Sequence, residues 1–178
     1  MRIARCELPT AALLQKYSQT PAYTDCYMTR VPGRVSYEDF VRAFYTTALF
    51  KTERALLKWF AGRPSTDADA NALATGAASQ FAAWRVEGRA QRQILLADFT
   101  GRTRSWLMTQ AIEHSDGSGE TLLYFGSAVV PAGKPGTGEA ALGETISALL
   151  GFHKLYSRLL LGAARRRALR ATQRNTVA

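Results

Sequence analysis

Residues 139–167 read EAALGETISALLGFHKLYSRLLLGAARRR, and this stretch decides the fold that the sequence predicts. On a helical wheel at about 100° per residue, its apolar face has the spacing of a helix that packs against a core. That face consists of Leu142, Ile146, Leu149, His153, Tyr156 and Leu160. Two polar-tipped side chains, His153 and Tyr156, therefore interrupt an apolar stripe. We expect this helix to lie against a sheet, with a cavity between the two.

Five upstream segments have the alternation of β-strands, and clusters of turn-forming residues separate them. The predicted strands cover residues 23–31, 81–87, 92–99, 103–113 and 121–130. Short connections join the last four strands, which is typical of an antiparallel meander. The sequence therefore predicts an antiparallel sheet ahead of the long helix.

Between the first strand and the meander, the apolar residues change to helical spacing. Ser36, with Asp39 three positions later, resembles a capping box and opens a helical stretch over residues 36–60. The β-branched residues 46–47 lower helix propensity, so the stretch is either two helices or one bent helix. Strands and helices in this order indicate an α+β fold with the helices laid across one face of the sheet.

The length of 178 residues indicates one domain with two flanking segments. Residues 1–22 form an N-terminal extension, residues 23–167 the domain, and residues 168–178 a basic C-terminal tail. Within the domain, Ser65 or Thr66 caps a further short helix.

Most of the formal charge of +9 comes from the C-terminal end of the chain. Seven basic residues follow His153, and the rest of the chain holds sixteen basic and fourteen acidic residues, a net charge of only +2. The basic cluster either contacts an anionic surface or complements the negative end of the helix dipole. No aromatic residues interleave with the arginines, which argues against a nucleic-acid surface. The candidate contacts are Arg165, Arg166, Arg167 and Arg170.

Two cysteines, Cys6 and Cys26, are too few for a disulfide framework or a zinc site. The chain shows neither the apolar segment of a signal peptide nor an apolar run long enough to span a bilayer. We therefore expect a cytoplasmic protein with two reduced thiols, and a Cys6–Cys26 bridge is the alternative. The sequence indicates no cofactor, and Asp67 and Asp69 lack the further ligands of a calcium loop.

Several segments carry a resemblance to a known superfamily. They read YTDCY at 23–27, AFY at 43–45, FKTER at 50–54, GRTRSW at 101–106, YFGSA at 124–128 and GFHKLY at 151–156. From about residue 20 to 165 the chain resembles bacterial proteins of unknown function in the START-like and birch-pollen-allergen-like superfamily. The resemblance implies a helix-grip fold, in which a curved antiparallel sheet wraps around a long C-terminal helix. It also implies an apolar pocket for lipids, polyketides, steroids or similar ligands. The superfamily commonly has more strands than the five predicted here.

The candidate site residues lie on the predicted helix face and on the strands that should meet it. The candidates for ligand binding are His153, Tyr156, Leu149, Trp84, Trp106, Met108, Tyr124 and Arg104. An aspartate beside His153 would orient the imidazole and stabilise its protonated form, so His153 and Asp98 are weak catalytic candidates. The alternative is that His153 and Tyr156 only pack in the core. Strand alternation does not identify the cavity face, because both faces of 94–99 are apolar apart from Asp98, and both faces of 121–130 are apolar throughout.

Three functions agree with these features. The first is binding of an apolar or amphipathic small molecule between the sheet and the C-terminal helix. The second is an enzyme of the same fold, a cyclase, isomerase or hydrolase, that uses His153 with a carboxylate. The third is docking on an anionic surface or a nucleic acid through the arginine-rich tail. The sequence alone does not decide whether the protein is an enzyme.

Overall fold

The structure is a computed structural model, and it describes residues 2–52, 54, 64–131 and 156–170. The strands are β1 (Ala4–Arg5), β2 (Tyr23–Pro32), β3 (Gln80–Phe81), β4 (Trp84–Ala90), β5 (Gln93–Asp98), β6 (Thr103–Glu113) and β7 (Gly119–Val129). The helices are α1 (Gln15–Ser18), α2 (Tyr37–Tyr45) and α4 (Asp67–Thr75), and residues 48–52, 54 and 156–170 are also helical. The fold is α+β, as predicted. None of the helices within these ranges is long and apolar enough to cross a membrane.

The seven strands form one open antiparallel sheet in the order β1-β2-β7-β6-β5-β4-β3. Strands β4 to β7 pair with their neighbours in chain order, which confirms the predicted meander. Strand β2 joins the meander by pairing with β7, from Tyr23 opposite Val129 to Pro32 opposite Glu120. The second strand of the chain, β2, and the last strand of the meander, β7, are therefore neighbours in the sheet.

The prediction of five strands was wrong in two places. Strand β1 has only two residues, and so short a strand has no alternation that the sequence could reveal. The predicted strand over 81–87 is divided into β3 and β4, because Ala82 adopts a positive φ of 51° in a turn between them. Strand β4 then continues to Ala90, through residues whose composition predicted a turn.

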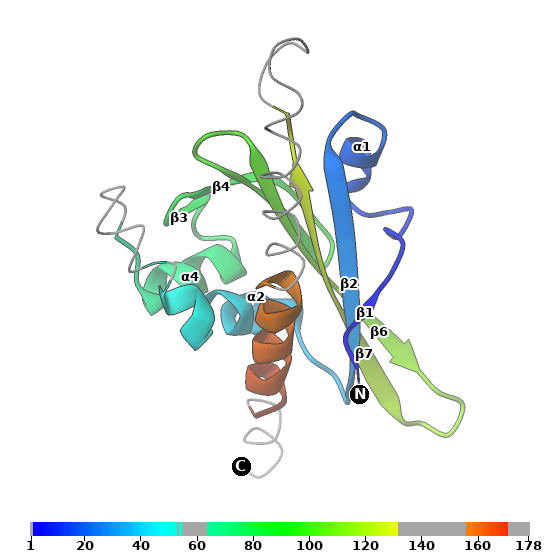
Figure 1. The fold of residues 1–178 in the computed structure, drawn as a ribbon. Coiled ribbons are helices and arrows are strands. Elements are labelled where there is room, and N and C mark those ends of the chain that lie inside the picture. Colours follow the sequence, from blue (N-terminus) through cyan, green and yellow to red (C-terminus); the bar gives the residue numbers. More distant parts are fainter. Residues whose placement is uncertain (1, 53, 55–63, 132–155, 171–178) are drawn as a thin grey trace.

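Each face of the sheet carries its own apolar core. We call the face that packs against α2, α4 and helix 156–170 the inner face, where Leu107 and Phe125 lie. The outer face carries Trp106 and Leu95 and is covered by residues 6–18, which we call the N-terminal segment. Figure 1 shows α2, α4 and the helix near the C-terminus on one side of the sheet and α1 on the other. The part of the outer face beneath the N-terminal segment is thus buried rather than solvated.

Helix α2 begins where the sequence predicted. The Ser36 hydroxyl accepts a hydrogen bond from the Asp39 amide at 3.0 Å, as an N-cap does. The helix ends at Tyr45, and the Thr46 hydroxyl donates to the Arg42 carbonyl at 2.7 Å. Helical residues resume at 48. The end of the predicted stretch lies outside the described residues, so the choice between two helices and one bent helix stays a prediction.

The described part of the C-terminal helix, residues 156–170, presents an apolar stripe to the inner face. Leu160 and Ala164 are buried in the inner core. Arg166 and Arg167 are exposed. The predicted helix began at 139, and that part of it lies outside the described residues. The helix also runs to 170, three residues beyond the end that the sequence predicted.

Helix α4 has a complete capping box. The Thr66 hydroxyl accepts from the Asp69 amide at 3.2 Å, and the Asp69 carboxylate accepts from the Thr66 amide at 2.7 Å. Gly76 ends the helix in the left-handed region with φ of 83°. The helix buries Ala70 and Leu73 in the inner core. The sequence-based choice of Ser65 or Thr66 as the cap is therefore resolved in favour of Thr66.

Replacing Thr66 with alanine is expected to lower the free energy of unfolding by about 1 kcal/mol, because the Asp69 amide loses its acceptor. Urea denaturation of the two proteins measures the difference. Thr66→Ser keeps the hydroxyl and should stay close to the wild type. An alanine variant as stable as the serine variant would show that the box does not stabilise α4.

Candidate functional site

Four polar side chains form a row across the inner face. In the strand register, Asp25 of β2 lies opposite Ser127 of β7, and Ser127 lies opposite Ser105 of β6. The Ser127 hydroxyl donates to Asp25 Oδ1 at 2.5 Å, and the Tyr45 hydroxyl of α2 lies 3.2 Å from Ser105 Oγ. All four residues are buried. We call Asp25, Ser127, Ser105 and Tyr45 the polar row.

The polar row follows directly from strand alternation. Residues two apart in β2 point to the same side, so Tyr27 and Asp25 share the inner face. The next row along consists of Tyr27, Phe125 and Leu107, which are cross-strand neighbours and belong to the inner core. The row is therefore a polar band beside an apolar one, at the end of the inner face where β2 begins and β7 ends.

Asp25 is the unusual member of the row. Its side chain is only 3% exposed, yet within the described part of the chain Oδ2 has no hydrogen-bond partner of normal geometry. Burial raises the pKa of Tyr23, and the nearby Asp25 carboxylate raises it further, by its charge and by a weak hydrogen-bond interaction with the Tyr23 hydroxyl. The pKa of Tyr27 is raised by burial and, to a smaller extent, by the charge of Asp25. A buried carboxylate oxygen that is not fully hydrogen-bonded costs free energy, so Oδ2 can accept from a donor group that reaches it.

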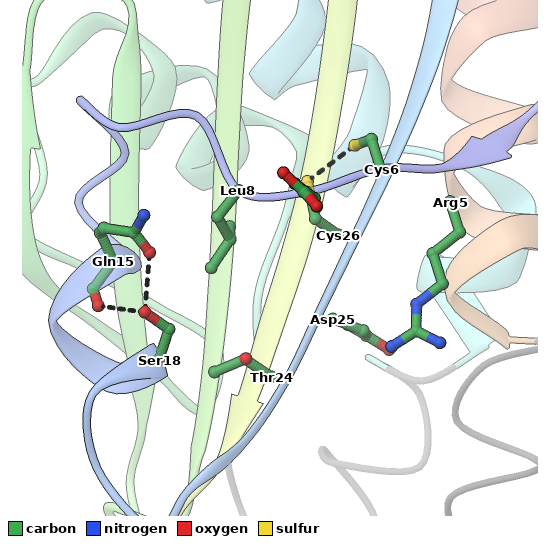
Figure 2. A pocket seen from close by; sticks show the side chains of 9 residues that line it. Arg5, Cys6, Leu8, Gln15, Ser18, Thr24, Asp25 and Cys26 are labelled. Carbon is green, nitrogen blue, oxygen red and sulfur yellow. Dashed lines mark hydrogen bonds between the residues drawn. The ribbon is translucent and has the colours of Figure 1, made fainter.

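A cleft of about 560 Å³ lies at the β2 edge of the sheet, between β2 and the N-terminal segment. We call it the edge cleft; its lining residues are Arg5, Cys6, Glu7, Leu8, Gln15, Ser18, Thr24, Asp25 and Cys26. Figure 2 shows the Arg5 guanidinium extending toward Asp25. Asp25 belongs to both the edge cleft and the polar row. The edge cleft and the polar row therefore meet at this one residue.

Three of the predicted site residues lie on the outer face. Trp106, Met108 and Tyr124 pack with the N-terminal segment in the outer core. They therefore lie on the face opposite to the described part of the C-terminal helix, residues 156–170. Alternation could not reveal this, because the N-terminal segment buries the outer face and makes both faces apolar.

Arg104 also points to the outer face, where it is already paired. Its Nε donates to the Tyr17 hydroxyl at 2.7 Å and lies 2.5 Å from Glu87 Oε2. The Tyr17 hydroxyl in turn donates to Glu87 Oε1 at 2.6 Å. Lys16 forms a second ion pair with Glu87. These hydrogen bonds and ion pairs connect α1 to strands β4 and β6.

The remaining candidates are divided between the inner core and a turn. Trp84 and Tyr156 are partly buried against the inner core. Asp98 ends β5 and accepts from the amides of Arg102 and Thr103, at 2.8 and 3.1 Å. The Asp98 carboxylate is therefore already hydrogen-bonded within the hairpin turn. The candidates His153 and Leu149 lie outside the described residues.

A second cleft, of about 610 Å³, lies beside the start of α2. Arg34 and Glu113, which both line it, form an exposed ion pair. The Thr121 hydroxyl accepts from the Val35 amide at 3.0 Å and donates to the Gly33 carbonyl at 2.8 Å. These lining groups satisfy one another, so we assign no ligand to this cleft.

One residue of the polar row, Asp25, could have been recognised from the sequence. Asp25 is the one carboxylate among the β2 residues of the same strand side, which also include Tyr23, Tyr27 and Thr29. A carboxylate at such a position on a core-facing strand side indicates a functional site. Ser127 and Ser105 carried no comparable signal, because their position opposite Asp25 depends on a strand pairing that the sequence does not specify.

No three histidine, cysteine, aspartate or glutamate side chains in the described ranges are grouped so that they could hold a metal ion. No model of a known protein family matches the sequence, and comparison with curated proteins gives no match.

Proposed function

We propose that the protein binds a small apolar or amphipathic molecule on the inner face of its sheet, with Asp25 contacting the polar end of that molecule. The observation that carries the proposal is the buried Asp25 Oδ2, which has no hydrogen-bond partner of normal geometry among the described residues and belongs to a residue shared by the edge cleft and the polar row. Ligand pockets commonly combine apolar walls with a few polar groups that fix orientation. Tyr27 and Phe125 supply the adjacent apolar surface.

The same proposal includes the helix-grip arrangement, in which the sheet wraps around the C-terminal helix. A seven-stranded antiparallel sheet supports it. So does the packing of helix 156–170 on the inner face, through Leu160, Leu161 and Ala164. In such a fold the ligand lies between sheet and helix, the side to which the polar row faces.

The first experiment is native mass spectrometry of protein purified from its own host, followed by denaturation to identify any small molecule that accompanies it. A stoichiometric amphipathic molecule is the expected result. Binding is then measured for linear alcohols and amines, which carry donors, and for carboxylic acids of the same chain length. Alcohols and amines should raise the melting temperature, whereas the acids should not, since carboxylates repel Asp25.

Asp25→Asn is expected to weaken binding of the amine roughly tenfold or more, because the charged acceptor becomes a neutral amide. Isothermal titration calorimetry measures the dissociation constants. Asp98→Asn is the matched control, since it makes the same chemical change in a turn and should leave binding intact. Equal affinities for wild type and Asp25→Asn would show that Asp25 does not contact the ligand. Absence of binding to all three ligand series would overturn the proposed function.

The second candidate function is an enzyme of the same fold that uses His153 with a carboxylate. One observation favours Asp25 over Asp98 as that carboxylate. Within residues 2–52, 54, 64–131 and 156–170, Asp25 Oδ2 has no hydrogen-bond partner of normal geometry, whereas both oxygens of Asp98 accept hydrogen bonds. Chromatography and mass spectrometry of the bound molecule after incubation test for turnover. If the protein is an enzyme, a product should form with the wild type and should be lost in both His153→Ala and Asp25→Asn. The His153→Ala variant should still bind the molecule.

A further inference from the structure

The two cysteines of the chain face each other across the first two strands. Ala4 pairs with Met28 and Arg5 with Tyr27, and the same register places Cys6 opposite Cys26. The Cys6 amide donates to the Cys26 carbonyl at 3.0 Å, which continues the ladder by one residue. The two sulfur atoms are 3.1 Å apart. Directly opposed residues of antiparallel strands have the Cα separation that a disulfide needs, so little backbone movement would be required.

The two thiols differ in access and in acidity. Cys6 is partly exposed, whereas Cys26 is only 2% exposed, and both line the edge cleft (Figure 2). The hydrogen bond with Cys26 lowers the pKa of Cys6. The same hydrogen bond, together with burial, raises the pKa of Cys26 above its ordinary value. A more acidic thiol at the surface beside a protected neighbour is typical of a reacting and a resolving cysteine.

We propose that Cys6 and Cys26 are a reversible oxidation site that reacts with hydroperoxides and closes to a disulfide between the N-terminal segment and β2. The Cys6 thiolate attacks a peroxide oxygen, forming an S–O bond as the O–O bond breaks and the alcohol or water leaves. The resulting sulfenic acid is then attacked by Cys26, so that the S–S bond forms, the S–O bond breaks and water leaves. Two electrons pass from the thiols to the peroxide, and a dithiol reverses the change.

Oxidation changes how the N-terminal segment is held. In the reduced protein, that segment is joined to the sheet by packing and by hydrogen bonds such as Leu13 to Gln93. The disulfide adds a covalent link between residues 20 positions apart. Closing a loop of this length is expected to raise the melting temperature by roughly 5 to 10 °C. It also fixes one wall of the edge cleft.

The test treats the full-length reduced protein with one equivalent of hydrogen peroxide, blocks the remaining thiols with N-ethylmaleimide under denaturing conditions and measures the intact mass. The expected product is a monomer that has lost two hydrogens, takes up no maleimide and regains both thiols with dithiothreitol. Two maleimide adducts, a disulfide-linked dimer, or Cys6 oxidised to sulfinic acid without a bridge would each overturn the proposal.

Single variants then separate the two roles. In Cys26→Ser, dimedone should trap a sulfenic acid on Cys6, because no resolving thiol remains. In Cys6→Ser, the remaining thiol should be consumed roughly tenfold more slowly, because Cys26 is buried. Equal rates in the two variants would contradict the assignment of Cys6 as the reacting cysteine. The wild-type mass measurement does not depend on either variant folding.

Discussion

Replacing Trp106 with alanine is expected to lower the free energy of unfolding by about 3–5 kcal/mol. Trp106 is fully buried on the outer face and is the largest such side chain in the described residues. Its indole donates to Gln93 Oε1 at 2.9 Å, and its ring centroid lies 6.2 Å from that of Tyr124. The backbone of Gly126 leaves room for it, since a Cβ there would come within 3.0 Å of the indole. Alanine would leave a large cavity under the N-terminal segment.

Gln93 connects this tryptophan to the segment that covers it. Its Oε1 also accepts from the Leu13 amide at 2.9 Å, and its Nε2 donates to the Ala11 carbonyl at 3.0 Å. Trp106→Ala should therefore also loosen the N-terminal segment, which limited proteolysis detects as earlier cleavage within residues 6–18. Trp106→Phe is the matched control, because it keeps most of the volume and should cost less than half as much. An alanine variant with wild-type stability and wild-type cleavage would show that the N-terminal segment does not bury Trp106.

Phe44→Ala is the second change with a large expected effect, again about 3–5 kcal/mol in the free energy of unfolding. Phe44 is 1% exposed, and its ring lies 4.9 Å from that of Phe125 and 5.2 Å from that of Tyr45, measured between centroids. It thereby links α2 to the centre of the inner face. Tyr45, the helical end of the polar row, depends on this contact for its position.

Chemical denaturation followed by circular dichroism gives the size of the effect. Phe44→Leu should cost less than half as much as alanine, because most of the buried volume is kept. Phe99→Ala removes the same side chain at a position that is 55% exposed, and it should change stability by no more than about 0.5 kcal/mol. Similar losses for Phe44→Ala and Phe99→Ala would mean that α2 is not anchored to the sheet through Phe44.

The sequence predicted those parts of the fold that depend on local chemistry. Strand β6 has the predicted bounds, and β2 differs by one residue, because clear turn residues limit both. The caps of α2 and α4 were predicted for the same reason. The division of 81–87 into two strands was not, since Ala82 has no sequence feature that favours a positive φ. Local composition predicts where a strand ends only when the turn uses glycine, proline, asparagine or aspartate.

The candidate site was predicted less well, because it depends on which sheet face each side chain occupies. Every residue from Thr121 to Ala128 is buried, so the alternation of β7 gives no contrast between faces. Trp106 and Tyr124 were therefore assigned to the helix side, although they lie beneath the N-terminal segment. Asp25 was the informative residue. Burying a carboxylate on the inner side of β2 costs free energy, and such residues are found there only when they are paired or have a function.

The seam between β2 and β7 also constrains the order in which a growing chain can fold. Cys26 pairs with Gly126, one hundred residues later, and β1 pairs with β2. Strands β4 to β7 are neighbours in sequence and can pair with one another locally. Strand β2 cannot complete its pairing with β7 until residue 129 has left the ribosome. Throughout that interval, a ten-residue strand exposes an unpaired edge. Nascent or truncated chains that end before β7 are therefore expected to associate through β2 and to require a chaperone.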